Sequence, residues 1–345
     1  MNGADFAPAA DPRPGRSCPL GYRYAPADLA SPAAWHTETL YVAGGLYGNR
    51  PALRRLLALY AREPEPKRLV FNGDFHWFDV DAAAYAEIGT SVLAHAAIRG
   101  NVETELAAAV DDDAEAGDVG PGAAETDAAG CGCAYPAWVD DAVVAHSNAI
   151  QRRLRATARQ HPELTRAAAA LPMWLRVEVG GLRVAIVHGD AQSLAGWGLA
   201  QEHLADAAHA ATVARWFEAA QVDAFACSHT CLPVFQRVGG AVDNALRTGL
   251  VLNNGAAGMP NFAGRQEGLL TRISTRAYPG PERRYGLRQA GLYIDAIGID
   301  YDTAQWQAEF LAQWPPGSAA HASYWRRIVD GPAHTPEQAM RVAAD

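Results

Sequence analysis

Short apolar segments that end in polar residues alternate along the chain with longer segments in which apolar residues recur at helical spacing. We expect strands at residues 39–43, 67–71, 97–99, 173–179, 182–187, 222–226, 234–237, 250–254, 269–275 and 292–300. We expect helices at residues 51–62, 81–95, 139–160, 201–220 and 303–313. The first segments form a β-turn-α-β unit, and the alternation as a whole predicts an α/β fold.

Polar residues with metal-binding chemistry follow four of the expected strands. They are the pairs Gly73-Asp74, Gly100-Asn101 and His188-Gly189, together with His229. Taken alone, each has an ordinary explanation as a turn residue, a helix cap or a buried histidine. However, open α/β sheets bind ligands at the carboxyl ends of their strands, and carboxylate, amide and imidazole groups suit Zn²⁺, Mn²⁺ or Fe. The four together predict a metal site at that edge.

Composition narrows the classes of function. The 345 residues carry a formal net charge of -9, and Lys67 is the only lysine. This acidity argues against a nucleic-acid-binding surface, which needs clustered Lys and Arg. The abundance of Ala and Arg is typical of a GC-rich bacterial genome. No apolar run is long enough to span a bilayer, no secretory signal is evident, and the number of cysteines is odd. We therefore expect a cytoplasmic protein without a membrane partner or a disulfide framework.

Changes in composition predict one large domain with appendages. Residues 1–35 are rich in Ala, Pro and Asp and are expected to form an extended arm, and residues 331–345 are expected to form a tail. Residues 36–330 are expected to form the domain. An acidic segment rich in Ala and Gly lies within it, and we expect a surface insertion at about 106–136.

The order of the polar motifs resembles that of the calcineurin-like metallophosphoesterases, which reads D-x-H, G-D, G-N-[HCV]-[DE], H-G and G-H-x-H. The corresponding segments here are Gly45-Leu46-Tyr47, Gly73-Asp74, Gly100-Asn101-Val102-Glu103, His188-Gly189 and Ser228-His229-Thr230-Cys231. Residues 253–260 also resemble a segment of the small bacterial phosphodiesterase-like members. The resemblance covers residues 38–310 and implies a sandwich of two mixed β-sheets flanked by helices.

The resemblance implies one intact and one altered metal site. In the family, the first ion is held by four residues whose counterparts here are Asp74, Asn101, His188 and His229. The second ion shares the aspartate and also uses positions that here read Gly45, Tyr47 and Cys231. Val102 stands where some members have a histidine that acts as general acid. One or two ions of Mn, Zn or Fe are the expected cofactor.

Three outcomes are open for the altered site. In the first, one ion suffices, with a water of lowered pKa as nucleophile and with Arg99 or a nest of backbone N–H groups helping to bind phosphate. In the second, Cys231, Tyr47, His76 or Asp79 rebuilds the second ion's site and gives an unusual centre. In the third, the chain binds metal and ligand without turnover.

The cysteines admit several interpretations. Cys231 is either a small buried residue or a thiolate ligand. Cys131, Cys133, Cys227 and Cys231 would form a four-thiolate zinc site, although their spacing matches common zinc motifs poorly. In a further alternative, the segment 131–133 folds back over the site and supplies a ligand.

These arguments predict a metal-dependent hydrolase that acts on a small-molecule or nucleotide phosphomonoester or phosphodiester through a metal-bound hydroxide. The candidate catalytic residues are Asp74, Asn101, His188 and Arg99. The candidate metal ligands are Asp74, Asn101, His188 and His229, and further candidates are Cys231, His76 and Tyr47. Candidates for contact with the substrate are Trp77, Phe78, Trp197, Asp190 and Ser193. The competing predictions are a catalytically silent metal-binding or regulatory protein on the same fold, and a metalloenzyme with a rebuilt cysteine-containing centre.

Overall fold

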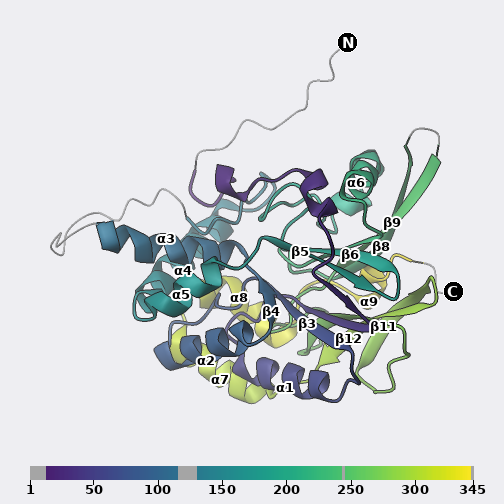
Figure 1. Cartoon of the computed structure of the whole chain (residues 1–345). Coiled ribbons are helices and arrows are strands. Elements are labelled where there is room, and N and C mark those ends of the chain that lie inside the picture. Colours follow the sequence, from purple (N-terminus) through teal and green to yellow (C-terminus); the bar gives the residue numbers. More distant parts are fainter. Residues whose placement is uncertain (1–12, 116–129, 243–244, 343–345) are drawn as a thin grey trace, which may run out of the picture.

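The computed structural model describes residues 13–115, 130–242 and 245–342, and its centre is a pair of six-stranded sheets (Figure 1). One sheet has the strand order β1-β5-β6-β7-β9-β8 and the other has the order β11-β12-β10-β2-β3-β4. The strands are β1 (Trp35–Thr37), β2 (Thr39–Ala43), β3 (Lys67–Asn72), β4 (Ala96–Ile98), β5 (Trp174–Val179), β6 (Leu182–Val187), β7 (Ala224–Cys227), β8 (Val234–Val242), β9 (Ala245–Asn253), β10 (Gly268–Ser274), β11 (Arg283–Gln289) and β12 (Leu292–Ile299). Each sheet contains both parallel and antiparallel pairs, so the expected sandwich of two mixed sheets is confirmed.

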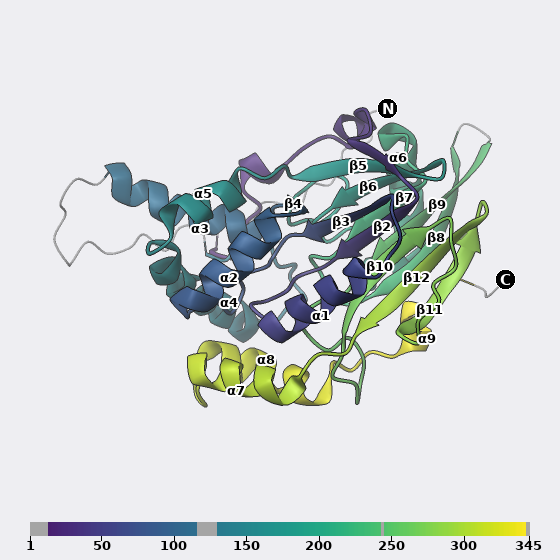
Figure 2. The same cartoon turned by 60° about the horizontal axis from the view of Figure 1, so that its bottom comes forward.

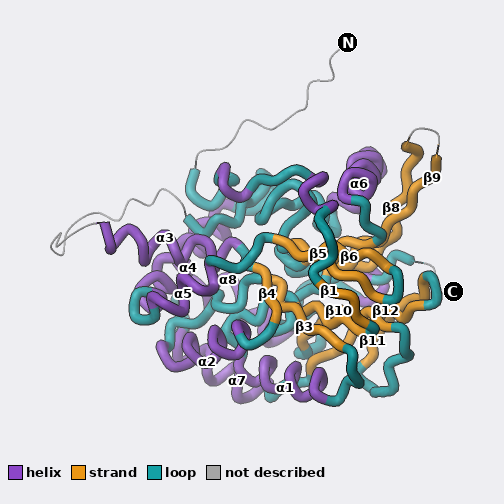
Figure 3. Tube along the Cα trace, viewed as in Figure 1, coloured by secondary structure: helices purple, strands orange, loops and turns teal. Residues whose placement is uncertain are grey.

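Helices cover the outer faces of both sheets. They are α1 (Arg50–Ala61), α2 (Ala82–Leu93), α3 (Asn101–Glu115), α4 (Asp141–Ala158), α5 (Pro162–Ala169), α6 (Ala207–Ala220), α7 (Thr303–Gln313), α8 (Ala319–Asp330) and α9 (Pro336–Ala339). Helix α6 packs on the β8/β9 side, whereas α1 to α5, α7 and α8 gather around the other sheet and its carboxyl edge (Figures 2 and 3). Within the described ranges, we find no helix with the length and apolarity needed to span a bilayer.

The strands read as continuous apolar runs because both of their faces are buried. In β2, Leu40 and Val42 face the second sheet, while Tyr41 and Ala43 pack against the helices. Strand β6 alternates in the same way between the space between the sheets and the face under α6. Successive side chains point to opposite faces of a strand, so a slip of one residue would move the side chains that face the other sheet to the helix-covered face, and the reverse. Because both faces are buried, the register of these strands is firmly specified.

Several element boundaries differ from the sequence predictions. Helix α6 begins at Ala207 and not at residue 201, because the side chain of Asp206 accepts a hydrogen bond from the backbone N–H of Ala208 and caps the helix. The strand expected at 234–237 continues to Val242 as one arm of a hairpin with β9. The elements β1, β11, α3, α5, α8 and α9 were not predicted, and α3 takes up the first part of the predicted acidic insertion.

The described parts of the predicted arm and tail both pack on the sandwich. The Tyr22 hydroxyl donates to Oε1 of Glu105 at 2.5 Å, and the Tyr24 hydroxyl donates to the carbonyl of Asp190 at 2.6 Å. At the other end, Met340 forms an isolated bridge with Phe235 of β8. Residues 1–12 and 343–345, and residues 116–129 of the acidic segment, lie outside the described residues.

The topology brings several strand ends to one edge of the sandwich. Strands β2, β3 and β4 run parallel in one sheet, and β6, β7 and β9 run parallel in the other. Their carboxyl ends therefore deliver loops from both sheets to a common place.

Candidate metal centre

Four of the predicted residues converge at this edge, each on a different loop. Asp74 lies two residues after β3, Asn101 begins α3, His188 directly follows β6, and His229 lies two residues after β7. Nε2 of His188 lies 3.2 Å from Oδ2 of Asp74, 3.2 Å from Oδ1 of Asn101 and 3.2 Å from Nδ1 of His229. Ligand atoms held tetrahedrally about 2.0–2.2 Å from a metal ion lie about 3.3–3.6 Å apart, so these separations suit a single ion.

The hydrogen bonds of the two imidazoles assign their tautomers. Nδ1 of His188 donates to the carbonyl of Asn72 at 2.8 Å, and Nε2 of His229 donates to the carbonyl of Cys133 at 3.0 Å. When the rings are neutral, the other nitrogen of each points a lone pair at the shared point. A backbone carbonyl behind a histidine is the usual arrangement in metal sites, because it fixes the orientation of the ring.

The electrostatics of the cluster also fit a cation. Burial disfavours ionisation of the Asp74 carboxyl, but His188 and His229 hold its pKa below the usual range. Burial opposes protonation of His188, yet Asp74 raises the pKa of His188 above its ordinary value, because the carboxylate attracts a positive charge to this point. Burial and the neighbouring His188 lower the pKa of His229 to about 4. Among the described residues, Asp74, His188 and His229 form a group of potential ligands whose atoms lie within 4.8 Å of one another.

Glu103 joins two of the ligand loops. Its buried carboxylate accepts hydrogen bonds from the backbone N–H groups of Asp74 at 2.9 Å, Phe75 at 2.9 Å and Gly100 at 2.8 Å. Asp74 has φ 55°, a left-handed conformation that is costly for a residue with a side chain. The three bonds hold that conformation in place and fix the distance between the Asp74 loop and the Asn101 loop.

The segment 131–133 folds over the ligands, and its contacts with them come mainly from the backbone. The carbonyl of Cys131 accepts from Nδ2 of Asn101 at 2.9 Å, which turns the amide oxygen toward His188. The Cys133 carbonyl accepts from His229, and the Cys133 thiol lies 3.5 Å from Nδ2 of Asn101. The described residues contain no four-cysteine grouping, so the structure does not support a four-thiolate site.

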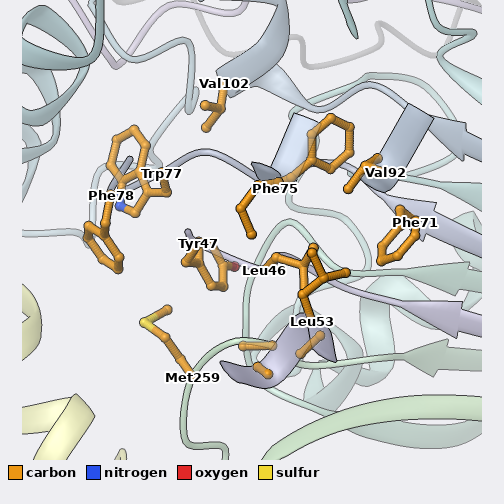
Figure 4. Packing of buried hydrophobic residues seen from close by; sticks show 14 of the residues in the cluster. Leu46, Tyr47, Leu53, Phe71, Phe75, Trp77, Phe78, Val92, Val102 and Met259 are labelled. Atoms are coloured by element: carbon orange, nitrogen blue, oxygen red, sulfur yellow. The ribbon is translucent and has the colours of Figure 1, made fainter. Parts of the chain in front are cut away.

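The Tyr47 side chain fills the space beside Gly45, and both are positions that the resemblance assigns to the altered site. A Cβ atom at Gly45 would lie 2.4 Å from Cζ and 2.7 Å from Oη of Tyr47, so the tyrosine ring occupies the space that a side chain at position 45 would need. The Tyr47 hydroxyl lies 2.7 Å from Sγ of Cys231. Figure 4 shows the ring amid Leu46, Trp77, Phe78 and Met259, and Tyr47 is 3% exposed.

Burial favours the uncharged forms of both Tyr47 and Cys231. Burial raises the pKa of the Tyr47 phenol well above its ordinary value, and Cys231 adds to the effect. Burial also raises the pKa of the Cys231 thiol, although Arg327 and Tyr47 oppose this. Both Tyr47 (φ 53°) and Cys231 (φ 59°) have left-handed backbone conformations, as Asp74 does.

Other candidates from the sequence lie elsewhere. His76 and Asp79 form a fully buried pair with 2.8 Å between Nδ1 and Oδ2, and the His76 ring stacks on Tyr85. Arg99 does not line the cavity, and its Nη1 donates to the carbonyls of Ala169 at 2.6 Å and Leu171 at 3.2 Å.

The remaining substrate-contact candidates divide between the cavity and the surrounding structure. The Asp190 carboxylate accepts from the backbone N–H groups of Gln192, Ser193 and Gly198 and holds its own loop. Ser193 lies 3.1 Å from the thiol of Cys18. Of the three candidate wall residues, Trp77 and Trp197 line the cavity, whereas Phe78 packs edge-on against Phe310.

A cavity of about 160 Å³ opens beside the candidate ligands. Asp74, Asn101, His229, Tyr47, Val102, Cys133 and Cys231 line it, and its aromatic walls are Trp77, Tyr135, Trp197 and Tyr324. Trp197 packs edge-on against His229, and Trp138, which is 55% exposed, packs edge-on against Trp197. The aromatic surface therefore extends from the ligand cluster to solvent.

Two lining residues, Tyr324 and Arg327, come from α8, a helix that the sequence analysis missed. Nη2 of Arg327 donates to the carbonyl of Cys231 at 2.8 Å, and Nε donates to the carbonyl of Pro260 at 3.2 Å. The signal for this helix was present: Ser318 follows Pro-Pro-Gly and caps the helix, and Ala320, Tyr324 and Ile328 recur at helical spacing.

Comparison with known proteins places the fold. No family model and no curated protein matches the chain. Hypothetical protein PH1004 from Pyrococcus horikoshii OT3 is similar over 87% of this chain and 100% of its own, with a TM-score of 0.54 and 13% identity. A metallophosphoesterase from Sphaerobacter thermophilus is similar over 86% of this chain and 100% of its own, with a TM-score of 0.47 and 17% identity.

The class that the fold and the ligand cluster define is a two-sheet α/β sandwich with a candidate metal centre at the carboxyl edge of its strands. The two mixed sheets with helices outside form the fold that the resemblance to the calcineurin-like metallophosphoesterases implied.

Proposed function

We propose that the chain is a metal-dependent phosphoester hydrolase that acts on a small-molecule or nucleotide phosphomonoester or phosphodiester. The observation that carries the proposal is the convergence of four donor atoms, from Asp74, Asn101, His188 and His229, on one point. When both rings are neutral, their tautomers leave lone pairs there that can bind a cation. The order of the motifs along the chain favours phosphoesters as the substrate class.

In this proposal the chain's own residues hold and orient the ion. Asp74 supplies the negative charge, Asn101 a neutral oxygen, and His188 and His229 neutral nitrogens, so a divalent ion keeps a net positive charge that attracts phosphate. A bound ion of this kind polarises a phosphoryl oxygen and lowers the pKa of water. The Asn72 and Cys133 carbonyls keep the imidazoles in the ligating orientation.

The size and walls of the cavity support a substrate that inserts only its phosphoryl end. A volume of about 160 Å³ is below the roughly 300–1,000 Å³ of pockets that enclose drug-sized ligands. Trp77, Tyr135 and Trp197 limit the access of water to that end. The rest of the substrate would then extend along the aromatic surface toward Trp138.

A catalytically silent metal-binding protein is the second candidate. Two features support it: the Tyr47 ring fills the space beside Gly45, and Val102 cannot transfer a proton. The two candidates share the ion site and differ only in turnover.

The experiment measures metal content and hydrolysis on the same preparations. Purified chain is loaded with Mn²⁺, Zn²⁺ or Fe²⁺, its metal content is determined by mass spectrometry, and hydrolysis of p-nitrophenyl phosphate and bis(p-nitrophenyl) phosphate is followed. The test variant is Asp74→Asn, and Asp330→Asn, the same change at an exposed position, is the matched control.

We expect about one ion per chain, metal-dependent hydrolysis, and loss of both in Asp74→Asn but not in Asp330→Asn. Retained metal with no hydrolysis of either ester under any metal would favour the silent protein and refute the hydrolase. A chain that binds none of the three metals would refute both candidates.

A further inference from the structure

A hydrolase with one ion needs a second source of positive charge for the phosphoryl group. In two-ion sites both cations stabilise the attacking and leaving oxygens. Here the ring of Tyr47 excludes a side chain at position 45, and its hydroxyl is paired with the thiol of Cys231. If the proposed function holds, the charge has to come from a residue.

One residue is placed to supply it. Of the described residues that line the cavity, Arg327 alone is a lysine or an arginine. It is half-buried, and its guanidinium is held beside Cys231, on the side of the cavity that the altered ion site would have occupied. Arg99, the candidate from the sequence, does not line the cavity.

The contacts of Arg327 orient it for this task. The bonds from Nη2 to the Cys231 carbonyl and from Nε to the Pro260 carbonyl fix the plane of the guanidinium. They use two of its five N–H donors. A planar guanidinium fixed in this way is suited to bind phosphate oxygens with two parallel hydrogen bonds, which a lysine cannot do.

We propose that Arg327 binds the phosphoryl oxygens of the substrate beside a single divalent ion, in the role that a second ion has in two-ion phosphoesterases. The inference rests on the proposed function, since it assigns a phosphate-binding residue to that same cavity. It also gives α8, which follows the sandwich in the chain, a direct part in the site.

The test measures binding of inorganic phosphate by calorimetry to the metal-loaded full-length chain and, separately, to the metal-free chain. Arg327→Gln is compared with Arg326→Gln, which removes the same charge from the exposed neighbouring position of α8. Metal content and circular dichroism are recorded for each variant. We expect phosphate affinity to fall by about tenfold to a hundredfold in Arg327→Gln, because a charge-assisted bidentate contact is lost, and by less than about twofold in Arg326→Gln.

A second measurement does not depend on a variant that folds. The wild-type chain is treated with phenylglyoxal, an arginine reagent, with and without phosphate, and modified peptides are quantified by mass spectrometry. Phosphate should protect Arg327 and leave the modification of Arg326 unchanged.

The outcomes separate this inference from the proposed function. The role of Arg327 would be overturned if Arg327→Gln bound phosphate with an affinity within twofold of wild type. It would also be overturned if phosphate did not change the modification of Arg327. Either result would count even if hydrolysis is observed. Conversely, Arg327-dependent phosphate binding without hydrolysis would support the inference and refute the hydrolase.

Discussion

The packing of Tyr47 into the space beside Gly45 can be tested with Gly45→Ala. The added Cβ would lie 2.4 Å from Cζ of Tyr47, whereas ordinary contacts begin at 3.4 Å, so the ring has to move by about 1 Å. The ring is 3% exposed and its hydroxyl is paired with Cys231, so movement disturbs both packing and that hydrogen bond. Overpacking costs about 1–3 kcal/mol and a hydrogen bond about 0.5–1.5 kcal/mol, which gives an expected loss of about 1.5–4.5 kcal/mol in the free energy of unfolding.

A double-mutant cycle isolates the cause of that loss. Tyr47→Ala alone leaves a cavity and should cost about 3–5 kcal/mol. In the Tyr47→Ala background, Gly45→Ala has room for its methyl group and should cost less than about 0.5 kcal/mol, so the coupling between the two positions should be about 1–4.5 kcal/mol. Gly21→Ala serves as a control, because a Cβ at Gly21 meets nothing within 4 Å.

The assay is urea denaturation of the four members of the cycle, followed by circular dichroism. The reasoning would be wrong if the effects of the two substitutions added within about 0.5 kcal/mol. It would also be wrong if Gly45→Ala were as harmless as Gly21→Ala, since the space beside Gly45 would then be open to a second ion's ligand.

Three further predictions concern the supports of the site and of the fold. Glu103→Gln replaces one carboxylate oxygen with an NH₂ group, which cannot accept a hydrogen bond, so at least one bond from the Asp74 or Asn101 loop is lost. We expect the free energy of unfolding, measured by denaturation, to fall by about 1–3 kcal/mol. Metal binding, measured by titration, should weaken roughly 10–100-fold. Burial opposes ionisation of Glu282, but its bond to Arg62 and other partners lowers its pKa from 4.5 to about 2. The stability it contributes is fully present above about pH 4.5 and is lost as the pH falls toward 2, by about 2–3 kcal/mol, and this pH dependence should be weaker in Glu282→Gln. Removal of the ion with a chelator should lower the melting temperature, and restoring the ion at 100 times its Kd should return about 2.7 kcal/mol.

Each of these has an outcome that would contradict it. Unchanged metal affinity in Glu103→Gln would show that the hydrogen bonds of Glu103 do not position the ligands. An identical acid denaturation profile in Glu282→Gln would mean that the Glu282 carboxyl is not held by its arginine partners. A melting temperature that changes with neither chelator nor added metal would argue against a specific ion in the folded chain.

The strand-end residues were the part of the site that the sequence could indicate. Each of the four candidate ligands follows an apolar strand that is buried on both faces; they are Asp74, Asn101, His188 and His229. Parallel strands of one sheet have their carboxyl ends at the same edge. Local pattern therefore sufficed to predict that these side chains would meet. Their fine orientation depends on carbonyls from distant segments, such as that of Cys133, which no local pattern contains.

The rest of the cavity depends on tertiary packing. Arg327 lies on a helix that the Pro-Pro-Gly segment separates from α7, and only the docking of α8 brings it to Cys231. The Tyr47 side chain folds back into space that Gly45 leaves vacant, a choice between rotamers that spacing cannot reveal. Arg99 looked suitable by position, but nearby carbonyls at the end of α5 bind its guanidinium.

The left-handed backbone conformations at Asp74, Tyr47 and Cys231 place backbone strain and side-chain packing in opposition at the cavity. All three have side chains where glycine would be comfortable, and such conformations cost of order 1 kcal/mol or more each. Glycine at position 47 would relieve that strain but would also remove a buried ring whose loss costs about 3–5 kcal/mol. Selection of this protein for thermal stability alone would therefore retain Tyr47 and, with it, the strained backbone beside the cavity.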